Sequence, residues 1–145
     1  MKILLSIKPE FVKEIFFGKK KFEYRKSIFT NKKVTSVIVY STMPVGKIVG
    51  EFTIEAVLMD KPQTLWRKTS EYSGISKKFF DEYFAGRDQA YAIKIGTLLL
   101  YDDPIDPYEK WDSFVPPQSF RYIDDLIEEP KLEFTSYFIS EMVCR

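Results

Sequence analysis

The chain has 145 residues, of which 45% are hydrophobic and 17% aromatic, so it can bury a core within one domain and lacks the composition of a disordered protein. It contains no histidine and one cysteine, Cys144, which excludes histidine-dependent catalysis, internal disulfides and a zinc site built from His and Cys. The net charge of +1 hides an asymmetry, because residues 1–50 hold 11 Lys and Arg against 3 Asp and Glu, whereas residues 101–145 hold 4 against 11.

The start of the chain predicts a strand, a helix and a second strand. Residues 2–7 form a short apolar run typical of a buried strand. Pro9 suits the first turn of a helix, and Gly18 suits its end. Residues 20–26 alternate in polarity, which predicts a strand with its charged side chains on one face.

The middle of the chain predicts two longer strands followed by a helix. Residues 34–41 are strongly β-branched and predict a central strand. Residues 47–58 predict a long strand, in which Gly50 is a candidate bulge. Asp60, with Gln63 three residues later, has the spacing of a capping box and predicts the start of a helix.

The last part of the chain predicts one more helix and further strands. Ser76 predicts the N-cap of a helix whose Phe-rich stretch, residues 79–84, we interpret as core. Residues 89–101 return to a strand pattern, and residues 102–107 predict a turn. The last strand candidate covers residues 132–143.

Taken together, these elements indicate an α+β fold: five or six mixed strands with helices inserted between them, forming a small curved sheet or β-barrel. No repeat or linker divides the chain, so we expect a single domain over residues 1–145. No apolar run approaches the ~20 residues needed to cross a bilayer, and the N-terminus lacks a signal-peptide pattern. We therefore expect a cytoplasmic protein with no membrane partner.

The segment from Gly18 to Arg25 is the most informative one, and it reads G-x-K-x-x-E-x-R. Gly18 allows a sharp turn, which places Lys20 at the mouth of the sheet. Glu23 and Arg25 are two residues apart, so both project from the same face of the strand. A cation, a carboxylate and a forked guanidinium on one surface can bind a phosphate together with the edge of a base.

This motif resembles the ASCH family of the PUA-like superfamily, whose members open with a strand, a helix and the same spacing. Other segments are similar in the same order, including Tyr40-Ser41-Thr42 at a strand end, the strand after Pro44, and residues 116–122. The resemblance spans about residues 2–123. It implies a PUA-like β-barrel with a cleft between barrel and helices that is expected to bind RNA.

We interpret the chain as a nucleic-acid-binding module, with RNA or a nucleotide as its ligand and no metal or other cofactor. Lys20 and Arg25 are predicted to contact phosphate or a base carbonyl, and Glu23 to accept a hydrogen bond from an exocyclic amine or to orient Arg25. The predicted nucleic-acid-binding residues are Lys8, Lys20, Glu23, Arg25, Lys26, Lys32, Lys33, Tyr40, Ser41 and Thr42. The alternative for most of these residues is an ordinary solvated face with weak ion pairs.

Two other functions remain open from the sequence. One branch of the family hydrolyses acetylated cytidine without metal, and Lys20 and Glu55 match its lysine and glutamate. Its threonine is replaced here by Glu23, and a carboxylate beside Lys20 favours the ammonium form, which is the wrong form for a nucleophile or base. An amidohydrolase with Lys20, Glu23 and Glu55 as catalytic residues is therefore the alternative to RNA binding. The other possibility is a transcriptional regulator that senses a nucleotide.

Overall fold

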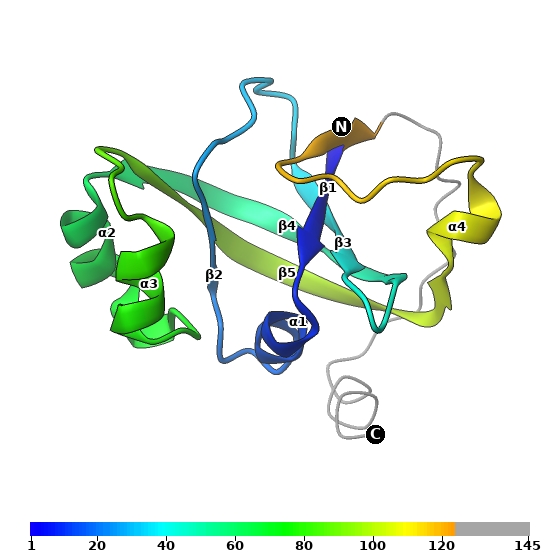
Figure 1. Cartoon of the computed structure of the whole chain (residues 1–145), viewed down its shortest axis with the longest axis horizontal. Helices are drawn as coiled ribbons and strands as arrows, with labels where there is room; N and C mark the ends of the chain where they lie inside the picture. Colours follow the sequence, from blue (N-terminus) through cyan, green and yellow to red (C-terminus); the bar gives the residue numbers. More distant parts are fainter. Residues whose placement is uncertain (124–145) are drawn as a thin grey trace.

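The computed structural model describes residues 1–123, so the strand candidate at residues 132–143 lies outside the described part. Helices and strands follow one another in a mixed order (Figure 1). In chain order they are β1 (Lys2–Ile7), α1 (Pro9–Phe16), β2 (Phe22–Arg25), β3 (Ser36–Ser41), β4 (Lys47–Asp60), α2 (Pro62–Thr69), a 3₁₀ turn (Ser70–Tyr72), α3 (Lys77–Tyr83), β5 (Ala90–Ile105), α4 (Pro107–Lys110) and β6 (Arg121–Ile123). None of the helices in residues 1–123 has the length and apolar character needed to span a membrane.

The six strands form one mixed sheet in the order β2-β5-β4-β3-β1-β6. β1 and β3 are parallel, and the remaining neighbours are antiparallel. The α+β class is confirmed, but the expected closed barrel is not, because β2 and β6 are the two edges of the sheet and are not paired with each other. Their short lengths, four and three residues, leave little backbone to form a closing ladder. Side chains connect the two edges instead, as in the 2.8 Å hydrogen bond between the hydroxyls of Ser27 and Ser119.

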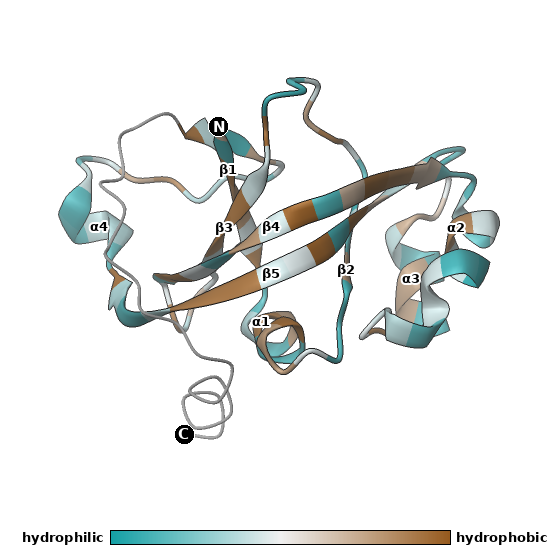
Figure 2. Cartoon of the chain, turned by 180° about the vertical axis from the view of Figure 1, so that it is seen from behind, coloured by the Kyte–Doolittle hydropathy of each residue, from teal (hydrophilic) through white to brown (hydrophobic). Residues whose placement is uncertain are grey.

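The longest feature of the sheet is the hairpin of β4 and β5, which runs across the whole molecule (Figure 1). Hydrophilic and hydrophobic residues alternate along the middle of β4, as expected for a strand with one buried face (Figure 2). The register against β3 shifts beside Gly50, which confirms the predicted bulge. A Cβ at Gly50 would lie 2.5 Å from the Leu99 carbonyl oxygen and 2.7 Å from Cζ of Phe16, so only glycine allows this close approach.

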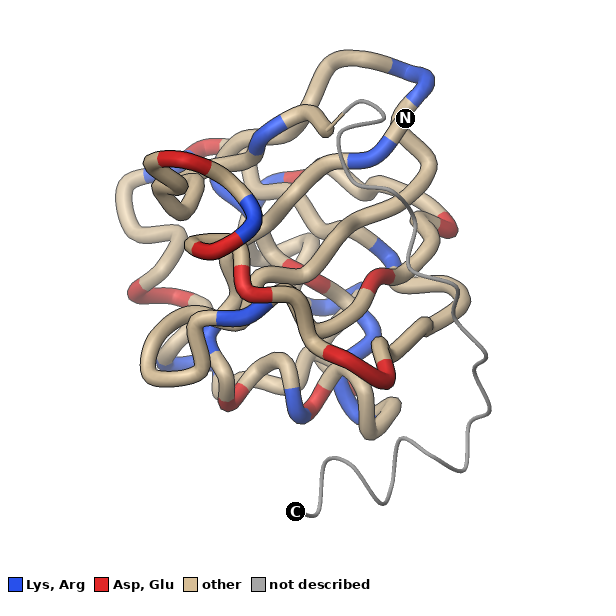
Figure 3. Tube along the Cα trace, turned by 90° about the vertical axis from the view of Figure 1, so that its right-hand side faces the viewer, with Lys and Arg blue, Asp and Glu red and all other residues tan. Residues whose placement is uncertain are grey.

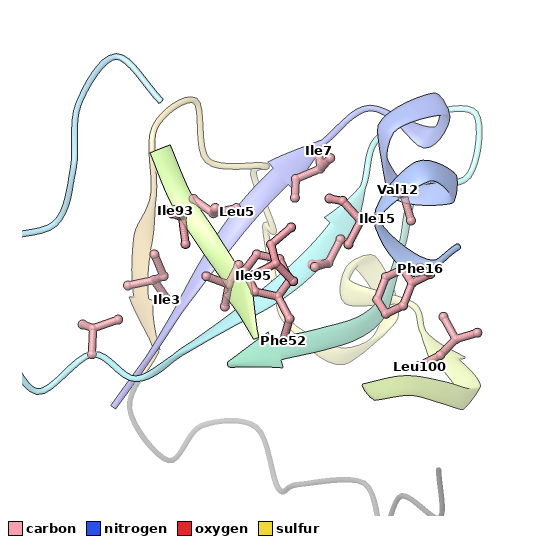
Figure 4. Close-up of a cluster of buried hydrophobic side chains, with 13 residues drawn as sticks. Ile3, Leu5, Ile7, Val12, Ile15, Phe16, Phe52, Ile93, Ile95 and Leu100 are labelled. Carbon is pink, nitrogen blue, oxygen red and sulfur yellow. The ribbon is translucent and has the colours of Figure 1, made fainter. Parts of the chain in front are cut away.

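The main core lies between α1 and one face of the sheet. Val12, Ile15 and Phe16 line one side of α1 and pack against side chains of β1, β4 and β5 (Figure 4). This packing follows from the helical spacing of these apolar residues, and it fixes the connection from β1 through α1 to β2. Gly18 ends the connection with a φ of 81°, in the left-handed region that favours glycine.

Helices α2 and α3 lie together at one end of the β4–β5 hairpin, and α4 lies towards the other end (Figure 1). The Ser76 hydroxyl caps α3 by accepting a hydrogen bond from the Phe79 amide, as predicted. The expected capping box at α2 is wrong, because Lys61 is the N-cap and the Gln63 amide donates to Asp81 on α3. The turn expected at residues 102–107 is also wrong: β5 continues to Ile105, and α4 begins at Pro107.

Candidate functional site

A pocket of about 230 Å³ opens where four separate parts of the chain meet. The end of β1 and the start of α1 form one side, β2 and the residues before it form the floor, and α3 forms the opposite wall. Gln118, from the segment before β6, completes the rim. The lining residues are Ser6, Ile7, Lys8, Phe11, Lys20, Glu23, Tyr24, Arg25, Ile75, Phe79, Tyr83 and Gln118.

Lys20 is buried in the floor of this pocket, with 2% of its surface exposed. Its ammonium nitrogen donates a 2.8 Å hydrogen bond to the Ser73 carbonyl oxygen and lies 4.9 Å from the centre of the Tyr24 ring. Burial lowers the pKa of Lys20, although the nearby carboxylates of Glu23 and Glu14 act in the opposite direction. The expectation that Glu23 would favour the ammonium form thus has the correct sign, but desolvation outweighs it.

Glu23 is buried beside Lys20, with 7% of its surface exposed. Burial raises the pKa of its carboxyl group, and the positive charges of Lys20 and Arg25 only partly oppose this effect. Its Oε2 atom is buried and has no hydrogen-bond partner. Within residues 1–123 no lysine or arginine forms an ion pair with this carboxyl group. Such an atom is costly to bury and accordingly indicates a place for a ligand.

Arg25 lies at the outer end of β2 and is partly exposed. Its guanidinium donates a 2.6 Å hydrogen bond to the Ser119 carbonyl oxygen, which joins the edge strand β2 to the segment before β6. The remaining N–H groups of the fork are available to a phosphate or a carbonyl.

The wall formed by α3 is aromatic. Phe79 and Tyr83 are one helical turn apart, and their ring planes differ by 10°. Each ring has a lysine near it: Lys8 lies 5.7 Å from the centre of Phe79, and Lys26 lies 4.7 Å from the centre of Tyr83. Aromatic faces flanked by cations suit a stacked base and its phosphate.

The sequence interpretation assigned the whole Phe-rich stretch to the core, and the structure divides it between core and pocket. Phe80 and Phe84 are buried against Leu65, Phe22 and Tyr24, whereas Phe79 and Tyr83 face the pocket. Tyr24 is tied to α2 by a 2.6 Å hydrogen bond between its hydroxyl and that of Thr69. The signal for this division was the presence of two i,i+4 aromatic pairs offset by one residue.

The structure brings together four of the residues predicted from sequence, namely Lys8, Lys20, Glu23 and Arg25, and places Lys26 beside their aromatic wall. Lys32 and Lys33 are exposed in the loop before β3 and do not line the pocket. Thr42 follows β3, also outside the lining.

Tyr40, Ser41 and Glu55 also lie outside the pocket lining. Tyr40 is fully buried in a second core cluster, and Ser41 borders a different groove, beside α1. Glu55 is exposed on β4, where it forms a 3.5 Å ion pair with Lys94.

Charge on the described residues is mixed rather than gathered on one face, as the interspersed colours of Figure 3 show. Residues 1–123 nevertheless hold 20 Lys and Arg against 15 Asp and Glu, a net basic balance. Among these residues there is no group of three His, Cys, Asp or Glu side chains arranged to hold a metal ion. The positive charges at this site come from side chains around the pocket, namely Lys8, Lys20, Arg25 and Lys26.

Comparison with known proteins gives consistent matches. The ASCH domain model matches residues 5–99. Over 126 residues, the chain is 31% identical to an ASCH domain-containing ribonuclease from Zymomonas mobilis, which covers 83% of this chain and 82% of that protein. It is also 34% identical over 121 residues to the large ribosomal subunit protein uL22 of Ureaplasma parvum. That match covers 83% of this chain but spans only 39% of the ribosomal protein.

Solved structures agree with these sequence matches. The crystal structure of ASCH from Zymomonas mobilis superposes with a TM-score of 0.78 at 28% identity, covering 85% of this chain and 87% of that one. A Tyr-to-Phe variant of the same protein gives a TM-score of 0.79 at 27% identity, with coverage of 86% and 91%.

Proposed function

The chain belongs to the ASCH domain family, and on that premise we propose that it binds single-stranded RNA, with one base held in the pocket above Lys20 and Glu23. The observation that carries the proposal is the buried Oε2 of Glu23, which has no partner and belongs to a residue lining a cavity with aromatic rings in its wall. A similar protein is named a ribonuclease, which supports RNA as the class of ligand.

The arrangement suits a base that is unstacked from its strand. Phe79 and Tyr83 supply aromatic surface on one wall, and Phe11 extends it through an edge-to-face contact with Phe79, the ring centres being 5.4 Å apart. Buried hydrogen-bonding groups can then read the edge of the base, as in proteins that bind flipped-out nucleotides. Lys8 and Arg25 in the lining and Lys26 beside Tyr83 would contact the flanking phosphates.

The proposal is tested by fluorescence anisotropy with a labelled single-stranded RNA at several salt concentrations. We expect affinity to fall as salt rises, and each phosphate contact removed to reduce the slope of log K against log salt by about 0.7. Lys26→Ala should therefore weaken binding and flatten the slope. Lys110→Ala, which removes the same charge from α4 towards the other end of the molecule, is the matched control and should bind like the wild type.

Lys20→Met tests the floor of the pocket. It removes a buried ammonium while keeping an unbranched apolar stem, so the fold should persist and RNA binding should be lost. An absence of salt-dependent RNA binding by the wild type would refute the proposed function.

RNA cleavage is a second candidate, favoured by the named relative and by the lowered pKa of Lys20. Lowering the pKa of a lysine increases the share of its uncharged form, which can accept a proton. The first step needs no water as nucleophile: the 2′-oxygen attacks the adjacent phosphorus, its proton passes to Lys20, and the bond from phosphorus to the 5′-oxygen breaks. The departing 5′-oxygen takes up a proton from solvent, to which Lys20 then returns its own. The products would be a 2′,3′-cyclic phosphate and a 5′-hydroxyl end. Appearance of these ends with a chelator present, and their loss in Lys20→Met, would establish the activity.

The geometry gives less support to an amidohydrolase acting on acylated cytidine. Glu55, one of the catalytic residues predicted for that reaction, is paired with Lys94 away from the pocket, which leaves Glu23 as the one carboxylate among the described lining residues. A nucleotide sensor remains the outcome if free nucleotides bind and RNA does not.

A further inference from the structure

Glu23 and Lys20 together define a hydrogen-bonding pattern in the floor of the pocket. Each is the leading charged neighbour of the other, and both residues line the same cavity. They nevertheless lie beyond ion-pair distance, and Oε2 of Glu23 has no partner. The pair is therefore not satisfied internally, and a ligand can complete it.

The donors and acceptors of this pair follow from burial. Because burial raises the pKa of Glu23, its carboxyl group is held towards the uncharged form, which offers one O–H donor and one carbonyl acceptor side by side. Lys20 offers N–H donors in either protonation state, one of which is already used by the Ser73 carbonyl oxygen. The floor therefore presents an adjacent donor and acceptor, flanked by a further donor.

We propose that this pocket selects a pyrimidine base over a purine, with Glu23 pairing to the N3 edge of the base as an uncharged carboxylic acid and Lys20 donating to its O2. The inference rests on the proposed function, since it names the class of base that the pocket takes from RNA.

The pairing edges of the four bases explain the choice. Cytosine presents an amine donor and the N3 acceptor, uracil presents the O4 acceptor and the N3–H donor, and an uncharged carboxyl group can pair with either by exchanging its two oxygens. In both bases the next group is the O2 carbonyl, which accepts from Lys20. Guanine has an amine donor at that position, opposed to the lysine, and adenine has only a C–H.

The size of the cavity sets no preference between the two classes of base. Its volume of about 230 Å³ holds a single base of either kind. Phe11 and Phe79 in its lining touch edge to face, with ring centres 5.4 Å apart. The choice of base therefore rests on the hydrogen-bonding groups of the floor.

The experiment compares oligouridylate, oligocytidylate and oligoadenylate of equal length by fluorescence anisotropy at one salt concentration. The wild type should bind the two pyrimidine oligomers roughly tenfold more tightly than oligoadenylate, which is the discrimination typical of one well-paired base edge. Calorimetry with the 5′-monophosphates of uridine, cytidine and adenosine repeats the comparison without differences in strand stacking.

Two variants of Glu23 test how the base is read. Glu23→Gln keeps one donor and one acceptor and should retain the pyrimidine preference, whereas Glu23→Ala should bind all three oligomers with the affinity of oligoadenylate. Loss of the pyrimidine preference in Glu23→Gln would overturn the proposal that Glu23 recognises the base as an uncharged carboxylic acid. Salt-dependent binding with equal affinity for all three oligomers would overturn the inference and leave the proposed function intact. No binding to any oligomer would refute the proposed function itself.

Discussion

The position of Lys20 depends on a glycine that is distant in sequence, and this gives the sharpest test of the site's construction. Gly74 has a φ of 68°, and a Cβ placed on it would lie 2.6 Å from Cβ and 2.7 Å from Cγ of Lys20. The lysine stem cannot move aside easily, because it is buried and its ammonium is held by the Ser73 carbonyl oxygen. Gly74→Ala should therefore displace the side chain that forms the floor of the pocket.

The magnitude follows from two separate costs. An alanine in the left-handed region costs about 1 kcal/mol, and forcing a methyl group into a packed site costs about 1–3 kcal/mol more. Gly86→Ala is the matched control, because Gly86 has a φ of 76° and no atom within 4 Å of the added Cβ. We expect Gly86→Ala to lower the free energy of unfolding by about 1 kcal/mol and Gly74→Ala to lower it by about 2–4 kcal/mol.

Urea unfolding measures both variants, and RNA binding gives a second readout. Gly74→Ala should weaken RNA binding as well as stability, whereas Gly86→Ala should leave binding unchanged. Equal loss of stability in the two variants would show that Gly74 does not pack against Lys20 and would refute the reasoning.

Three further predictions concern the walls and floor of the pocket. Ser76→Ala removes the cap of α3 and should lower the free energy of unfolding by about 1 kcal/mol in urea unfolding, with weaker RNA binding because the aromatic wall loosens. Tyr24→Phe removes the hydroxyl that bonds to Thr69, while Thr69 keeps its own bond to the Leu65 carbonyl oxygen. The free energy of unfolding should therefore fall by about 1 kcal/mol, and a fall of more than about 3 kcal/mol would contradict this. Burial raises the folded pKa of Glu23 despite the charges of Lys20 and Arg25, so the folded state holds its proton more tightly than the unfolded state does. The free energy of unfolding of the wild type should therefore fall, relative to Glu23→Gln, as the pH rises above about 4.3, the unfolded pKa of Glu, and the difference should level off above the folded pKa. Parallel curves of stability against pH for the two proteins would contradict this.

Local pattern was sufficient to predict most of the sheet. The β-branched run at residues 34–41 and the long run at residues 47–58 became adjacent central strands, because such residues pack well on a pleated and buried surface. The Gly50 bulge was also visible, since a glycine inside a strand marks a close approach of backbone. Whether the sheet closes into a barrel was not predictable, because that depends on the pairing of edge strands that are only a few residues long; in the structure the two edge strands are not paired with each other.

The site was predictable only where its residues are near one another in sequence. Lys20, Glu23 and Arg25 belong to one short motif, and the structure does place them in one pocket. The opposite wall on α3 begins more than fifty residues later, and the bond from Lys20 to Ser73 joins residues 53 positions apart. No local periodicity reports such a contact. Tyr40 is the reverse case: a polar tip at a strand end predicts contact with a ligand, whereas the structure buries this side chain against Tyr108 and Phe114.

The buried ionisable residues at this edge of the sheet carry an energetic cost that packing alone does not explain. Burial shifts the pKa of Lys20 downwards and that of Glu23 upwards, so both side chains are held towards their uncharged forms. An apolar pair of similar volume would stabilise the same junction of β2 and α3 better, because buried charged groups rarely recover their desolvation cost. Natural sequences break such local rules mainly at functional sites. The helices α2 and α3 make this possible, because they cover β2 with an aromatic wall and turn an exposed edge strand into the floor of a pocket.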